Sequence, residues 1–66
     1  MNNTLISEIR AAATQSDLFN LIEGEYDLPA DQTWGETASQ WEAEDDPDMD
    51  AVRVLRAAER RWLELG

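Results

Sequence analysis

The stretch PDMDAVRVLRAAERRWLEL, residues 47–65, has the longest helical pattern in the sequence and decides the fold. Its apolar residues recur mostly three or four positions apart, so they share one face of a helix. They are Ala51, Val54, Leu55, Ala58, Trp62 and Leu65. Asp46 is a candidate N-cap, and Pro47 suits the first helical position because its missing N–H would have no partner there. We therefore predict a long helix over residues 47–65.

The residues before this stretch predict a second helix, over residues 34–44, that packs on the long one. Thr33 and Glu36 have the spacing of a capping box, in which each side chain accepts a hydrogen bond from the backbone N–H of the other residue. Three apolar residues follow at helical spacing on one face. They are Trp34, Ala38 and Trp41. Both tryptophans, like Trp62, are expected to lie in the core. The alternative is that one of them stays partly exposed and anchors a partner, and Trp41 is then favoured because it adjoins the acidic residues that follow it.

Two shorter helices are predicted at the start of the chain, over residues 5–13 and 15–23, from apolar residues at helical spacing. Thr14 is a candidate N-cap for the second, and Gly24 is a candidate C′ residue because glycine tolerates the left-handed conformation. No stretch alternates apolar and polar residues as a strand would. We predict an all-α fold, a compact bundle of about four short helices with the last one longest. Residues 1–66 would form a single acidic domain.

The charge of the chain is large and unevenly distributed. Fifteen acidic residues and five arginines, with no lysine or histidine, give a net charge of −10. Residues 1–52 hold 13 acids and one arginine, a net of −12, and residues 53–66 hold four arginines and two acids, a net of +2. Such a field repels nucleic acids and anionic membranes, and it attracts basic surfaces. The expected partner is a basic protein surface, with no direct contact to nucleic acid or membrane.

The most acidic stretch is WEAEDDPDMD, residues 41–50, which holds six carboxylates in the nine residues after its tryptophan. Acids at the start of the long helix are stabilising. Glu42 and Glu44, however, fall near the C-terminal end of the preceding helix, where the helix dipole disfavours negative charge. Local conflicts of this kind are typical of functional sites. The predicted partner-binding residues are Trp41, Glu42, Glu44, Asp45, Asp46, Asp48 and Asp50. A secondary acidic patch comprises Glu23, Glu25, Asp27 and Asp31. The alternative is that these acids serve only solubility and helix capping.

The spacing of the charges in this run favours mimicry of a nucleic acid. Nine residues span about 13 Å as a helix and at most about 30 Å when extended, so six charges fall every ~2–5 Å. One DNA strand carries a phosphate every ~3.4 Å. In its size, its acidity and its lack of catalytic residues, the chain resembles the small acidic proteins that phages use against CRISPR–Cas or restriction enzymes. The resemblance implies a stoichiometric inhibitor, such as an anti-CRISPR protein that blocks DNA binding by a Cas complex in the cytoplasm of a host bacterium.

Catalysis and dedicated metal binding are not expected. Without Cys, His or Lys the chain has no thiol or amine nucleophile, no imidazole base to activate a serine, and neither cysteine nor histidine to bind zinc. Asp46, Asp48 and Asp50 have the spacing that opens a calcium loop. Ala51, however, stands where that loop needs glycine, and Ala57 stands where it needs glutamate. We predict no enzyme activity, no metal and no cofactor. The absence of a signal-like or long apolar segment predicts an intracellular protein.

The arginines of the long helix are predicted to pair with acids three residues away, as Asp50–Arg53, Arg56–Glu59 and Arg61–Glu64. Two other roles stay open for them. One is recognition of phosphate, and the other is a bridge to a second copy, which would give a homodimer. The alternative function of the chain is that of a small structural or regulatory adaptor, antitoxin-like or a phage-assembly protein, whose apolar helix face packs on a partner. Reversing the charge of the acidic run would abolish binding by an inhibitor and barely alter an adaptor.

Overall fold

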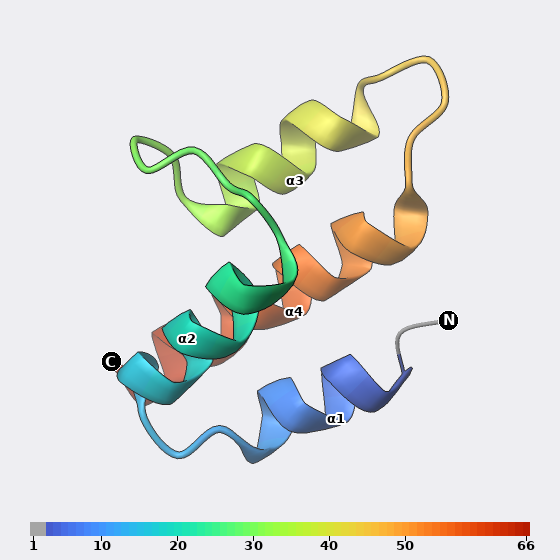
Figure 1. Cartoon of the computed structure of the whole chain (residues 1–66). Coiled ribbons are helices and arrows are strands. Elements are labelled where there is room, and N and C mark those ends of the chain that lie inside the picture. Colours follow the sequence, from blue (N-terminus) through green and yellow to red (C-terminus); the bar gives the residue numbers. More distant parts are fainter. Residues whose placement is uncertain (1–2) are drawn as a thin grey trace.

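A computed structural model describes residues 3–66, which form four helices and no strand (Figure 1). They are α1 (Asn3–Ala11), α2 (Gln15–Glu25), α3 (Trp34–Glu42) and α4 (Met49–Leu65). Residues 1 and 2 of the predicted domain lie outside this description. Helix α4 contacts each of the other three helices more extensively than these contact one another. In Figure 1, α3 lies above α4, α1 lies below it and α2 crosses in front. The predicted all-α bundle with its longest helix last is confirmed.

The core is built around α4. Four residues of its predicted apolar face are buried, and the last two, Trp62 and Leu65, are partly buried. Val52 lies off that face, yet only 1% of it is exposed. It is buried because three helices cover α4, so the buried surface is wider than one stripe. The rest of the apolar core comes from the other three helices and from the α1–α2 link; its residues are Leu5, Ile9, Ala12, Leu18, Ile22, Trp34 and Ala38.

Local capping signals fix the starts of α2 and α3 as predicted. Oγ1 of Thr14 accepts the N–H of Asp17 at 3.1 Å. The capping box of α3 is complete, because Oγ1 of Thr33 accepts the N–H of Glu36 at 3.1 Å and Oε1 of Glu36 accepts the N–H of Thr33 at 3.2 Å. Each of these bonds joins residues three apart, so the sequence alone was enough to find them.

The end of α2 differs from the prediction at Gly24. The helix continues through Gly24 to Glu25, and no residue in the described part of the chain has the positive φ that a glycine C′ position needs. Instead Tyr26 caps the helix, and its N–H donates to the carbonyl of Ile22 at 3.0 Å. The backbone of Tyr26 is extended and its ring packs against the core. Helix α1 is also shifted, because it begins and ends two residues earlier than predicted.

The prediction that Asp46 caps the last helix is wrong. Oδ1 of Asp48 accepts the N–H of Ala51 at 3.2 Å, so Asp48 is the N-cap and the helix begins at Met49. Asp46 and Pro47 lie before the cap, in the link that follows α3. That helix ends at Glu42, two residues earlier than predicted. Both aspartates are good capping residues, so local preference does not choose between them. The choice depends on how α4 packs against α3, because this packing sets the residue at which α4 can begin.

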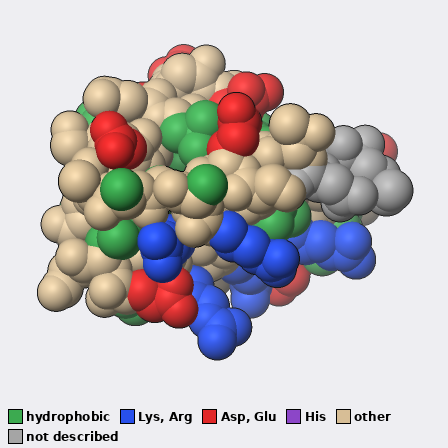
Figure 2. Space-filling model, turned by 90° about the horizontal axis from the view of Figure 1, so that it is seen from below, with side chains coloured by type: hydrophobic (Ala, Val, Ile, Leu, Met, Phe, Trp, Pro, Cys, Tyr) green, Lys and Arg blue, Asp and Glu red, His purple; other side chains and the backbone are tan. Residues whose placement is uncertain are grey.

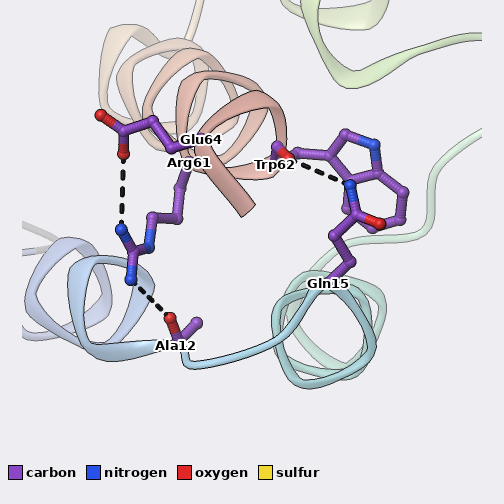
Figure 3. A network of polar contacts seen from close by, with 5 residues as sticks. All are labelled: Ala12, Gln15, Arg61, Trp62 and Glu64. Carbon is purple, nitrogen blue, oxygen red and sulfur yellow. Dashed lines mark hydrogen bonds and ion pairs between the residues drawn. The ribbon is translucent and has the colours of Figure 1, made fainter. Parts of the chain in front are cut away.

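Polar contacts join the C-terminal turn of α4 to the junction of α1 and α2 (Figure 3). Nη2 of Arg61 donates to the carbonyl of Ala12 at 2.8 Å, and Nη1 lies 3.5 Å from Oε1 of Glu64. Nε2 of Gln15 donates to the carbonyl of Trp62 at 3.1 Å. Two of these bonds link residues that are 47 and 49 positions apart in the sequence, so they hold the C-terminal turn of α4 against the junction of α1 and α2.

Candidate functional site

The acidic run of residues 42–50 is neither one helix nor one extended segment. Glu42 is the last residue of α3, and the carboxylates of Glu44, Asp45 and Asp46 lie in the link to α4. Asp48 caps α4, and the sixth acid, at position 50, lies in its first turn. All six are exposed. The run thus divides into a helix end, an irregular link and a helix start.

Among the described residues, two of these six acids have hydrogen-bond or ion-pair partners, and the other four, three of which lie in the link, have none. Oε1 of Glu42 lies 3.1 Å from Nη2 of Arg56, and the side chain of Asp48 serves as the cap. Within residues 3–66, the side chains in the link make no hydrogen bond or ion pair; these are Glu44, Asp45 and Asp46. Their charges are therefore fully available to a partner.

The partner of Glu42 resolves part of the local conflict that the sequence showed. Its carboxylate sits at the unfavourable end of the α3 dipole, but Arg56 on α4 neutralises it. The predicted pair Arg56–Glu59 is therefore wrong, because Arg56 pairs with Glu42. Among the described residues the predicted pair Asp50–Arg53 is absent as well, whereas Arg61–Glu64 is confirmed at 3.5 Å. The pair with Glu42 joins residues 14 apart, so helical spacing could not reveal it.

The secondary acidic patch spans the end of α2 and the link from α2 to α3. Glu23 and Glu25 lie in the last turn of α2, and Asp27 and Asp31 lie in the link. All four are exposed. Figure 1 shows that this link and the α3–α4 link leave opposite ends of α3. The two acidic segments therefore flank α3 along its length.

Tyr26 is the point where the two acidic segments act on one group. Burial raises the pKa of the Tyr26 phenol, and the carboxylates of Glu25, Asp48 and Asp50 raise this pKa further. The first of these acids belongs to the secondary patch and the other two to the acidic run. The ring of Tyr26 meets Trp41 edge to face, with 5.9 Å between ring centroids. Both rings are partly exposed, so an aromatic pair lies among the carboxylates. We call this region, with both acidic segments, the acidic surface.

The tryptophans differ in burial. Trp34 is 8% exposed and packs edge to face on Trp62, with ring centroids 5.4 Å apart. Trp62 and Trp41 are partly buried against the core. The core prediction is confirmed for Trp34, and the other two each keep an accessible edge. Trp41 adjoins the acidic run and is the aromatic residue that the sequence favoured as an anchor.

Sequence reasoning missed an apolar hollow near the C-terminal half of α4. It has a volume of about 380 Å³, and its walls are Phe19, Gln32, Thr33, Trp34, Glu59, Trp62 and Leu63. Phe19 is 47% exposed and Leu63 is 70% exposed. The available signal was that Leu63 is a large apolar residue off the buried face of α4.

A second hollow, of about 570 Å³, lies between α1 and α4 and is basic. Its walls are Ile9, Arg10, Arg56, Ala57, Arg60, Arg61 and Glu64. Figure 2 shows arginine side chains gathered on the face that is seen from below. We call this hollow the basic groove. The sequence indicated the arginines of α4, but the addition of Arg10 depends on how α1 packs.

The described residues hold no group of three acids that could bind a metal ion together. None of the helices in residues 3–66 has the length and apolar character required to cross a membrane. Comparisons of the chain with protein-family models, curated proteins and solved structures found no match.

Proposed function

We propose that this protein is a stoichiometric binding protein whose acidic surface occupies a basic, nucleic-acid-binding groove of another protein. The observation that carries the proposal is that Glu44, Asp45 and Asp46 are exposed and have no hydrogen-bond or ion-pair partner among the described residues, next to the partly exposed ring pair of Tyr26 and Trp41. The contact of Tyr26 with Trp41 places the start of the α2–α3 link beside the C-terminal end of α3, where the acidic run begins. A basic groove shaped for a nucleic-acid backbone would meet this negative field over an extended surface.

Charge and aromatic contact have different roles in this proposal. The unpaired carboxylates of Glu44, Asp45 and Asp46 would accelerate encounter with a basic partner, because electrostatic steering raises the association rate. The partly exposed rings of Tyr26 and Trp41 would slow dissociation, because buried aromatic residues often dominate the binding energy of an interface. The complex would then form fast at low salt and more slowly at high salt, and its affinity would fall as salt is added.

The proposed target is a Cas subunit or a Cas complex, blocked before it binds DNA in the cytoplasm of a host bacterium. The support for an anti-CRISPR function is the small size of the chain, its net charge of −10 and its lack of Cys, His and Lys. A protein without the usual nucleophiles inhibits by occupying a site, which requires one inhibitor for each target. Mimicry also predicts that added DNA competes with the inhibitor.

A tagged pull-down from bacterial lysate tests this function, with the bound proteins identified by mass spectrometry. At low salt we expect to recover a nucleic-acid-binding protein, and we expect high salt or added DNA to release it. The variant Glu44→Lys/Asp45→Lys should lose it. Each of these two changes adds two positive charges, so the variant gains +4. A partner that survives high salt, added DNA and this variant contradicts mimicry.

A matched control separates the position of the charge from its amount. Replacing Ser7, Glu8 and Asn20 with lysine also adds +4, because the acid contributes two units and each neutral residue contributes one. All three positions are exposed on α1 or α2, away from the two links. We expect this control to retain the partner. If it loses the partner equally, only the net charge matters and a shaped acidic surface is ruled out.

The apolar hollow favours a second candidate function, that of an adaptor that packs on a partner helix. Phe19 and Leu63 expose large apolar side chains beside this hollow. Leu63→Glu should abolish binding by an adaptor and leave binding by the acidic surface intact. Because Leu63 is 70% exposed, this substitution is not expected to disturb the core. The same pull-down therefore distinguishes the two functions.

A further inference from the structure

The basic groove is rich in arginine, although the protein as a whole is strongly acidic. Four of the five arginines of the chain line it, although the net charge is −10. They come from two helices, α1 for Arg10 and α4 for the other three, so the packing of α1 on α4 brings them together. Like charges that face one hollow repel one another, and such a conflict is expected where a site has a function.

Two of these arginines have partners within the protein. Arg56 pairs with Glu42 at 3.1 Å. Arg61 donates to the carbonyl of Ala12 and lies 3.5 Å from Glu64, and its Nε is buried with no acceptor. The contacts of Arg61 hold its guanidinium group against the end of α1. Arg56 is held only by its solvent-exposed ion pair with Glu42.

The other two arginines have no partner in the described part of the chain. Arg10 and Arg60 are exposed and make no hydrogen bond or ion pair there. Four guanidinium groups therefore face two carboxylates, those of Glu42 and Glu64, which leaves an excess of two positive charges at the groove. The exposed guanidinium groups keep all their N–H donors available to a ligand.

We propose that the basic groove binds a small molecule that carries a phosphate group. A phosphate monoester carries about −1.5 to −2 charges at neutral pH, which matches the excess at the groove. The planar guanidinium group donates two parallel hydrogen bonds to phosphate oxygens, and two free arginines could hold one phosphate from two sides.

The size and lining of the groove indicate that the ligand has an organic part. A volume of about 570 Å³ lies in the range of small-molecule pockets and exceeds what one phosphate fills. Ile9 and Ala57 add an apolar wall beside the arginines, against which such a part would pack. A long polyanion is disfavoured, because residues 1–52 carry a net charge of −12 that would repel its remaining phosphates.

The proposal for this site does not rest on the proposed function, although Arg56 of the groove pairs with Glu42 of the acidic run. The site lies between α1 and α4, whereas the acidic surface lies along α3 and its two links. A phosphate held by Arg10 and Arg60 would join α1 to α4. It would therefore stabilise the folded chain in proportion to its occupancy.

An NMR titration at constant ionic strength tests the site, with sodium chloride exchanged for the probe. The probes are inorganic phosphate and phenyl phosphate, and the signals are the backbone amides of Ile9 and Ala57 and the arginine Nε–Hε groups. We expect saturable shifts at the groove, with tighter binding of phenyl phosphate because its ring adds contact with the apolar wall. Thermal unfolding in the same solutions should shift to higher temperature.

Three variants make the titration decisive. Arg10→Gln/Arg60→Gln should raise Kd by about tenfold or more, because it removes charge-assisted hydrogen bonds. Arg10→Lys/Arg60→Lys keeps the charge but lacks the planar fork, so Kd should take an intermediate value. Arg53→Gln is the matched control, because Arg53 is exposed on α4 outside the groove, and its Kd should equal that of the wild type. All the replaced side chains are exposed, so each variant should fold, which circular dichroism checks.

Two results would overturn the proposal. One is that chloride shifts the same signals as phosphate, or that Arg10→Gln/Arg60→Gln binds phenyl phosphate like the wild type. The other is that a glutamate-rich peptide binds the groove more tightly than phenyl phosphate and with the same arginine dependence, which would assign the groove to an acidic polypeptide instead.

Discussion

The acidic surface and the basic groove differ in how the fold holds their charges. Three carboxylates of the acidic surface, those of Glu44, Asp45 and Asp46, lie in an irregular link and have no partner among residues 3–66. The four arginines of the groove lie on helices that pack against each other, and two of them make further contacts. Charges on a link suit an extended partner that is recognised by its field. Charges fixed on helices suit a compact ligand that is recognised by its shape.

Both surfaces nevertheless depend on α4. Its first turn carries Asp48 and Asp50 of the acidic surface, and its remaining turns carry three arginines of the groove. Glu42 and Arg56 join the two surfaces directly. Substitutions in or near α4 can therefore remove both surfaces, alter one, or change the coupling between them.

The largest effect is expected from Leu55→Ala, which would destabilise the whole fold and so remove the acidic surface and the basic groove together. Leu55 is fully buried at the centre of α4. A substitution of this kind lowers the free energy of unfolding by about 2–5 kcal/mol. A chain of this length has only about 3–10 kcal/mol in total. Urea unfolding followed by circular dichroism measures the change. The control is Leu63→Ala on the same helix, which is 70% exposed and should leave the midpoint nearly unchanged. Equal effects of the two substitutions would contradict the packing around α4.

A smaller effect is expected from Asp48→Ala, which removes the cap at the acidic end of α4. Removing the cap of α4 should lower the free energy of unfolding by about 0.5–2 kcal/mol, because the N–H of Ala51 loses its acceptor. Asp46→Ala is the matched control. It removes the same charge two residues earlier without removing a cap, so it should not destabilise the protein. If Asp46→Ala lowered the free energy of unfolding more than Asp48→Ala, the measurement would show that Asp46 is the cap.

This pair of aspartates shows how far the sequence determines the helices. Bonds between residues three apart, such as those of Thr33 with Glu36, follow from local chemistry and were predictable. Where two neighbouring residues have equal local preference, only the packing decides between them. Tyr26 ended α2 for a similar reason, because its ring packs against the core and the chain leaves the helix there without using Gly24.

The candidate sites were less predictable than the helices, because they combine distant residues. The acidic run is a property of adjacent positions, so composition revealed it. The pairing of Glu42 with Arg56, and the entry of Arg10 into the groove, depend on how helices from different parts of the chain pack. A periodic pattern in one helix does not contain that information. Val52 was missed for the same reason, because one stripe cannot show that α4 is covered from several sides.

The titration of Tyr26 measures whether the carboxylates of the acidic run act on a residue at the start of the α2–α3 link. Because the pKa of Tyr26 is raised by folding, the folded state holds the phenol proton more tightly than the unfolded state does. This stabilisation is complete below about pH 10, the usual tyrosine pKa, and is lost as the pH rises through the higher folded pKa. The chain has no Lys, Cys or His, and arginine stays charged, so the phenolate absorbance and the loss of stability both report Tyr26.

Two variants separate the causes of this shift. Asp48→Asn/Asp50→Asn should lower the pKa of Tyr26 part of the way toward its usual value, since burial, the largest cause, remains. Asparagine caps a helix as well as aspartate does, so α4 should stay intact. Asp45→Asn is the control, because Asp45 is not among the acids that act on this phenol. An unchanged pKa in the double variant would show that the acidic run does not reach Tyr26.

The smallest effect is expected at the ion pair that joins the two surfaces. The side chains of Arg56 and Glu42 are 52% and 47% exposed, so water screens their attraction. A double-mutant cycle of Glu42→Gln and Arg56→Gln should give a coupling energy of about 0.2–1 kcal/mol that decreases with added salt. Glu42→Gln alone should cost even less, because it also removes a carboxylate from the unfavourable end of the α3 dipole. It would free the guanidinium group of Arg56, so the groove should bind phenyl phosphate more tightly. Weaker binding would instead show that Glu42 holds the Arg56 side chain in the orientation that the ligand needs. The acidic surface would then affect the groove by positioning Arg56 and not by reducing its charge.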